Sequence, residues 1–164
     1  TKRKEHRTMH VYAWNYHTVI GIMLISLVAW NLLSRYIPEK IWKLLNLAGA
    51  CIAVLLILKF TVWGRIPRPQ HRFAFAAPVS SEFYREMIMN VFLYFPLGLT
   101  LSVLTGPWSV LMGFVLSLSI ESWQYIAGTG LAQGTDVICN TLGVAVGLIH
   151  LMKIRSTGGI HKWK

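Results

Sequence analysis

The sequence predicts an all-α fold, a polytopic integral membrane bundle with about five transmembrane helices. Three observations carry this prediction: 54% of the 164 residues are hydrophobic, only 13% are charged, and the apolar residues form long runs between short polar segments. A bilayer core of about 30 Å needs about 20 mainly apolar helical residues, and hydrocarbon leaves backbone amides no partner outside the helix. The runs that fit are residues 18–36, 44–63, 87–105, 108–127 and 137–152.

These runs set the expected organisation of the chain. We expect a basic N-terminal tail (1–17), two transmembrane helices without an assigned motif (18–63), a loop rich in proline and arginine (64–86), a three-helix region (87–152) and a basic C-terminal tail (153–164). The serines just before the third run are typical of a helix cap and predict an interfacial helix that turns into this span.

A glycine–proline pair separates the third run from the fourth. Gly106 and Pro107 predict a tight turn, which makes these two spans an antiparallel hairpin. The 64–86 loop and the 128–135 loop are therefore expected on the same side of the membrane.

The charge distribution separates two classes of partner. The formal net charge of +10 comes from 16 Lys and Arg against six Asp and Glu, a balance found in proteins that bind nucleic acids and in proteins that bind membrane surfaces. Here the basic residues flank the apolar runs, where cations contact lipid headgroups. We therefore expect membrane lipids as partners and no nucleic acid. Both sides of the membrane carry almost equal numbers of basic residues, so orientation stays open.

Two carboxylates stand out in the second half of the chain. Glu121 and Asp136 are the only charged residues between Met87 and Met152. A carboxylate at membrane depth costs about 2.5 to 3.5 kcal/mol on insertion scales, so it normally faces the bundle interior or a wet cavity. This cost makes both residues candidates for a functional site.

Polar side chains accompany both carboxylates. Glu121 and Gln124 share one helical face, and Asp136 and Asn140 share another, with both pairs near the same loop. Asn90, one turn into the third span, starts from that side as well. We predict that these five residues line a ligand-binding polar pocket that opens toward the 64–86 loop.

Simpler roles are available for the same residues. Asn90, Gln124 and Asn140 are also the residue types that hydrogen-bond between helices, at about 0.6 kcal/mol per contact. Asp136 equally suits the N-cap of the fifth helix, where the helix dipole stabilises a carboxylate. Both interpretations remain open at the level of sequence.

Metal and cofactor chemistry has weak support. His17 and His150 lie near span ends, where an imidazole can ligate haem or a pigment, but neither has a partner at metal-ligand spacing. The sequence also lacks the phosphate-loop, nucleophile-elbow and zinc-protease motifs of soluble enzymes. We expect no metal and no cofactor, and we assign no catalytic residue.

Three segments in order resemble the VanZ-like family of integral membrane proteins: Asn90 to Gly98 (NVFLYFPLG), Ser119 to Gln124 (SIESWQ) and Asp136 to Gly143 (DVICNTLG). The resemblance implies a compact helical membrane domain, and its name-giving members lower susceptibility to the antibiotic teicoplanin. It places the family's polar signature on Asn90, Pro96, Gly98, Glu121, Gln124, Asp136, Asn140 and Gly143.

The 128–135 loop departs from the family pattern. Gly130 and Gln133 stand where family members commonly have Arg and Asp, and the loop carries no charge. An Arg that holds an anionic headgroup would have to come from Arg65, Arg68 or Arg72 in the other loop.

Three functions follow as hypotheses. The first is a binding or protective protein of the bacterial inner membrane, whose polar site holds a lipid-linked envelope molecule. The alternative is an accessory subunit of a larger membrane complex, in which His17 or His150 contacts pigment or haem. The third is an enzyme that uses Glu121 and Asp136 as acid and base on a lipid-linked substrate; we favour a role without catalysis.

Overall fold

The computed structural model describes residues 18, 20–22, 24–34, 36–63, 72–75 and 80–156. Four long helices dominate this part: α2 (Glu39–Thr61), α3 (Ser81–Thr105), α4 (Trp108–Ala127) and α5 (Gly134–Ser156). A shorter apolar helix, Ile20–Leu33, precedes them. The predicted tail 1–17 and residues 157–164 lie outside the described residues.

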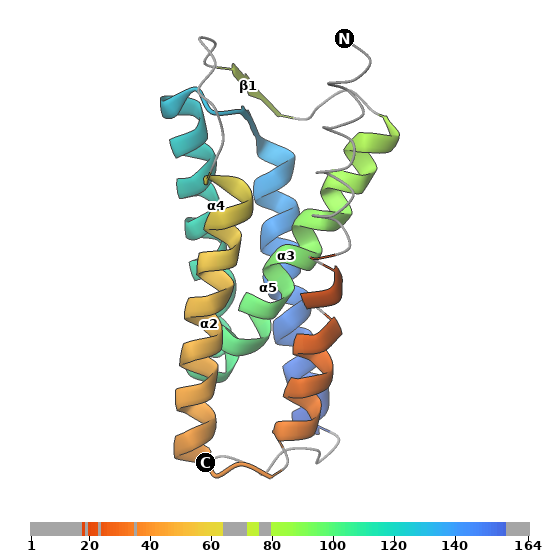
Figure 1. Ribbon diagram of the computed structural model, residues 1–164, viewed down its shortest axis with the longest axis vertical. Helices are drawn as coiled ribbons and strands as arrows, with labels where there is room; N and C mark the ends of the chain where they lie inside the picture. Colours follow the sequence, from red (N-terminus) through yellow and green to blue (C-terminus); the bar gives the residue numbers. More distant parts are fainter. Residues whose placement is uncertain are drawn as a thin grey trace.

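The helices run side by side along the long axis of the molecule (Figure 1). Helices α2 to α5 are each long and apolar enough to cross a membrane, and their outer faces expose large apolar side chains such as Leu55, Met112 and Ile149. In water such a surface would be unfavourable, whereas lipid accepts it. The predicted all-α membrane bundle is confirmed.

Helix ends differ from the predicted spans where a cap extends the helix. Helix α4 has the predicted bounds, but α3 already begins at Ser81. The Ser80 hydroxyl accepts a hydrogen bond from the Phe83 backbone N–H at 3.1 Å, so the cap starts the spanning helix itself. The predicted interfacial helix is therefore the first part of α3.

Glycines end two of the helices. Gly106 follows α3 with a φ of 59°, and Gly128 follows α4 with a φ of 62°, a region that favours glycine. The turn at Gly106 reverses the chain and makes α3 and α4 the predicted hairpin.

Helices α3 and α5 pack with their backbones in contact. A Cβ atom on Gly98 would collide with the backbone carbonyl oxygen of Val144, and one on Gly147 would lie 2.6 Å from the carbonyl carbon of Gly98. On Gly143 it would meet the carbonyl oxygen of Val91. Side chains larger than hydrogen are therefore excluded at three places along this contact.

Two short strands join the loops at one end of the bundle. Strand β1 (Arg72–Ala74) pairs in parallel with β2 (Leu131–Gln133), with Ala74 opposite Gln133. The Thr135 backbone N–H also donates to the carbonyl oxygen of Phe75 at 2.9 Å. Figure 1 shows β1 at the end of the bundle where α5 begins. The two loops do lie on the same side, and the strands are an addition that the sequence analysis did not predict.

Candidate functional site

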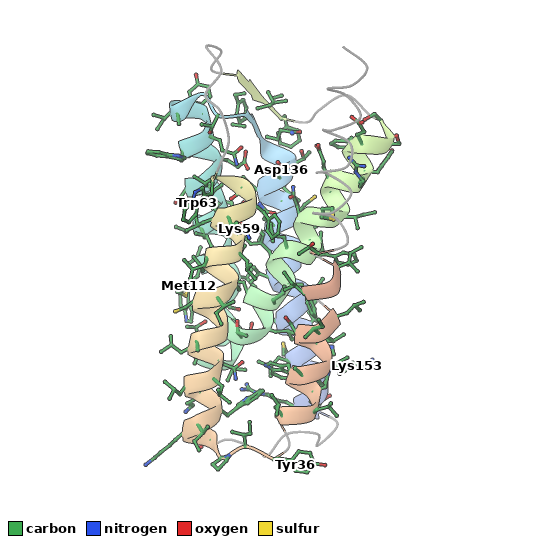
Figure 2. All side chains as sticks on the ribbon, viewed as in Figure 1. Tyr36, Lys59, Trp63, Met112, Asp136 and Lys153 are labelled. Carbon is green, nitrogen blue, oxygen red and sulfur yellow. The ribbon has the colours of Figure 1, made fainter. Side chains whose placement is uncertain are left out.

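A group of polar side chains lies between α3, α4 and α5 at the end covered by β2. We call it the polar cluster and define it as Tyr94, Ser117, Glu121, Asp136 and Asn140. Figure 2 shows Asp136 near the loop end of α5, at the same end of the bundle as Trp63. The cluster thus joins three helices just below the paired loops.

Glu121 connects α4 to strand β2. Its side chain is 7% exposed, and its Oε2 accepts a hydrogen bond from the backbone N–H of Gln133 at 2.9 Å. Because Gln133 also pairs with Ala74 in the sheet, one carboxylate holds the position of both loops. A buried carboxylate is tolerated only with such hydrogen bonds, so this contact offsets part of the cost of burying Glu121.

Asn140 connects α5 to α4. Its Nδ2 donates to the Ser117 hydroxyl at 2.8 Å, and Asn140 is 3% exposed. The other half of the amide is different, because Oδ1 is buried and has no hydrogen-bond partner among the described residues. Asn140 therefore both fastens two helices and presents an unused acceptor.

Tyr94 on α3 brings the second unused group. The residue is fully buried, and its hydroxyl has no hydrogen-bond partner in the described part of the chain. This hydroxyl lies close to Ser117 and within electrostatic reach of Glu121 and Asp136. A buried tyrosine hydroxyl usually finds a partner, so Tyr94 Oη and Asn140 Oδ1 are two unusual polar atoms of the same cluster.

Tyr94 is a site residue that the sequence analysis missed. It lies inside the first motif of the resemblance, one helical turn after Asn90, among apolar residues. The available signal was its hydroxyl, which needs a partner in the middle of an apolar span.

The two remaining predicted site residues are Gln124 and Asn90. Gln124 is buried, and its Nε2 donates to the backbone carbonyl oxygen of Thr61 at 3.2 Å. Thr61 ends α2, where backbone carbonyls lack helical partners. Asn90 is half-buried one turn before Tyr94. The structure thus brings Glu121, Asp136 and Asn140 together and places Gln124 against α2.

Two of the three loop arginines that were expected to hold an anionic headgroup lie outside the described residues. Arg65 and Arg68 are outside the described residues, whereas Arg72 is placed in β1 opposite Leu131. Gln133, where this sequence differs from the family pattern, contacts Glu121 through its backbone N–H. A direct role for the loop arginines stays a prediction.

His150 lies toward the far end of α5 from the polar cluster. Its Nε2 is 3.4 Å from the Asn31 amide nitrogen, and its ring meets Trp30 and Phe95 edge-on, with centroids 6.3 Å away in both cases. No group of three or more His, Cys, Asp or Glu able to hold a metal occurs among the described residues. His17 lies outside them.

A second feature of the bundle is an apolar hollow of about 10 Å³ beside the proline of α3. It lies between the Ile20–Leu33 helix, α2 and α3, and its lining is Ile22, Ala53, Leu56, Phe60, Phe92, Leu93 and Pro96. None of these residues belongs to the polar cluster, so the hollow and the cluster are separate features.

Comparisons with known proteins agree on one family. The family model of VanZ/LLP1 proteins matches residues 19–155, a range that includes the first two helices as well as the motif-bearing region. The chain is also 32% identical over 122 residues to Protein VanZ of Enterococcus faecium, which covers 72% of this chain and 70% of that protein. No solved structure matches the chain. The chain therefore belongs to the VanZ/LLP1 family of membrane proteins.

Proposed function

We propose that the polar cluster binds a polar group of a membrane-anchored envelope molecule, and that this binding protects the cell. The observation that carries the proposal is that two atoms of the cluster, Tyr94 Oη and Asn140 Oδ1, are buried without a hydrogen-bond partner among the described residues. They belong to different helices and both lie near Ser117. A ligand with a polar group at this place would form hydrogen bonds with both atoms.

The energetics favour a binding site over simple helix packing. A buried polar atom without a hydrogen bond costs about 1 to 3 kcal/mol, whereas a contact between polar side chains in a membrane contributes about 0.6 kcal/mol. Contacts that serve packing alone, such as Ser102 Oγ to Ser109 Oγ at 2.8 Å, leave neither hydroxyl without a partner. The cost accepted at Tyr94 and Asn140 fits atoms reserved for a ligand.

A binding role suits the state of Glu121 better than a catalytic one. Its carboxylate already accepts the backbone N–H of Gln133, which favours a residue that positions the loops. The VanZ-like resemblance points the same way, because the name-giving members lower susceptibility to teicoplanin. We place the protein in the bacterial cell (inner) membrane, with its ligand entering from the β1–β2 end.

Susceptibility of living cells tests this function. We would express the full chain and its variants at equal membrane levels in a teicoplanin-sensitive Gram-positive bacterium. We expect the wild type to raise the inhibitory concentration of teicoplanin and Tyr94→Phe to remove most of this increase, because only the hydroxyl is lost.

Ser102→Ala is the matched control. It also removes one buried hydroxyl from α3, but at the contact with Ser109, away from the polar cluster. We expect it to protect as the wild type does. Full protection by Tyr94→Phe would contradict a binding role for the cluster.

A further inference from the structure

We infer that the ligand presents a primary ammonium group, carried by a membrane lipid, to the polar cluster. The inference rests on the proposed function and names the chemical class of the bound group. Two independent features carry it: the kind of atom that the cluster leaves unused, and the sign of the charges that surround these atoms.

The unused atoms ask for a hydrogen-bond donor. An amide oxygen such as Asn140 Oδ1 can only accept a hydrogen bond, and it is buried without a donor among the described residues. Tyr94 Oη is able to accept as well as to donate. A phosphate or carboxylate oxygen would offer Asn140 no donor, whereas an ammonium group with three N–H bonds serves both atoms.

The charges around the cluster also favour a cationic ligand group. Glu121 and Asp136 both lie close enough to act on the Tyr94 hydroxyl, and both are acidic. No Lys or Arg is among the buried residues that the structure describes. In a medium of low dielectric constant, an anion placed beside these carboxylates would be repelled and a cation attracted.

Apart from Arg72, whose backbone lies in β1 opposite Leu131, the basic residues of the described part lie far from the cluster or are exposed. Lys153 is about 25 Å along α5 from Asp136, at 1.5 Å per residue, and Figure 2 shows it well away from the cluster. Lys40 and Lys43 belong to the first turns of α2, at the opposite end from the loops. Lys59 and Arg85 lie near the loop end but are exposed.

The start of α5, like Arg72 in β1, would favour an anion. Backbone N–H groups at a helix N-terminus attract negative charge. In this chain the acidic residue of the first turn is Asp136, which already supplies that charge. Since Asp136 is half-buried, it is the carboxylate that an incoming headgroup would meet first.

Two kinds of membrane lipid carry a primary ammonium group: aminophospholipids and lipid-linked cell-wall precursors with a free peptide amine. We would reconstitute the full chain in nanodiscs of phosphatidylglycerol containing an equal fraction of phosphatidylethanolamine or N-acetylated phosphatidylethanolamine. A second set would contain an amine-bearing lipid-linked precursor or its N-acetylated form. Native mass spectrometry would then count the lipid that stays bound after detergent extraction.

The acetylated forms isolate the ammonium group, because acetylation removes its charge and leaves the rest of the lipid. We expect at least one free amine to be retained about tenfold more than its acetylated form, the effect of one charge-assisted hydrogen bond. Retention by phosphatidylethanolamine supports the aminophospholipid as source, and retention by the precursor alone supports the precursor. Tyr94→Phe should lower this retention, and Ser102→Ala should leave it unchanged.

The variant Asp136→Asn tests the charge alone, because Asn keeps the shape of the side chain and removes its charge. We expect it to reduce the preference for free over acetylated amine. Equal retention of the free and acetylated forms, or a preference for phosphatidylglycerol that Tyr94→Phe abolishes, would overturn the ammonium inference and leave the proposed function standing. Retention that never depends on Tyr94 would overturn both.

Discussion

Glu121 of the polar cluster connects α4 to strand β2. Its carboxylate is buried beside Tyr94 and accepts the backbone N–H of Gln133 at 2.9 Å. The carboxylate that its membrane depth predicts as a site residue therefore makes a structural contact. Two substitutions of this side chain test that contact.

We expect Glu121→Ala to lower the free energy of unfolding by about 1 to 3 kcal/mol, because the buried Gln133 amide loses its acceptor. Glu121→Gln keeps a side-chain oxygen at this place and should lose much less. Equilibrium unfolding in mixed detergent micelles, followed by circular dichroism, measures both. Equal losses for the two variants would contradict the hydrogen-bond role of Glu121.

Three of the five predicted site residues, Glu121, Asp136 and Asn140, were placed together by helical spacing alone. Such spacing orders residues along a face, and two faces that start from one short loop must meet. Gln124 shares the face of Glu121, but its partner Thr61 depends on where α2 ends, which local sequence does not determine. Tyr94 was missed because an aromatic residue in an apolar span reads first as core.

Among the elements, α3 and α5 form the contact that holds the cluster in place. Three glycines let the two backbones touch, and Tyr94 and Asn140 project from the same pair of helices. The sequence spacing of Gly143 and Gly147, four residues apart, is typical of such a helix contact. The partner helix became visible only in the structure.

We expect Gly98→Ala to lower the free energy of unfolding by about 1 to 3 kcal/mol, because its new methyl group would collide with the backbone of Val144. Backbone atoms cannot move aside as a flexible side chain does. Gly21→Ala is the control, since a Cβ there has nothing within 4 Å, and it should be neutral or slightly stabilising. The same unfolding assay applies, and a Gly98→Ala protein as stable as Gly21→Ala would refute the close contact.

The strands β1 and β2 could not be predicted from the sequence. Each has three residues, too few to display the alternation that identifies a strand. They pair because the hairpin of α3 and α4 returns both loops to one end of the bundle. Their pairing is a tertiary consequence of the helix order.

At the scale of the whole molecule, the lipid-facing apolar surface and the polar cluster occupy different parts of the bundle. Apolar side chains cover its outer faces and glycines allow its helices to pack closely. The buried polar atoms without a partner among the described residues lie toward one end. The sequence was sufficient for the helical membrane fold because hydrophobic runs of spanning length have few other solutions. Membrane orientation was not, because the basic residues divide almost equally between the two sides.

The stability of Tyr94→Phe measured beside that of Ser102→Ala tests the central claim, that the polar cluster keeps atoms free for a ligand. The Tyr94 hydroxyl has no partner among the described residues, whereas the Ser102 hydroxyl bonds Ser109 at 2.8 Å. In lipid-free detergent, the account predicts that Tyr94→Phe keeps or gains stability while Ser102→Ala loses about 1 kcal/mol. An equal loss in Tyr94→Phe would contradict it, because the hydroxyl would then serve the fold.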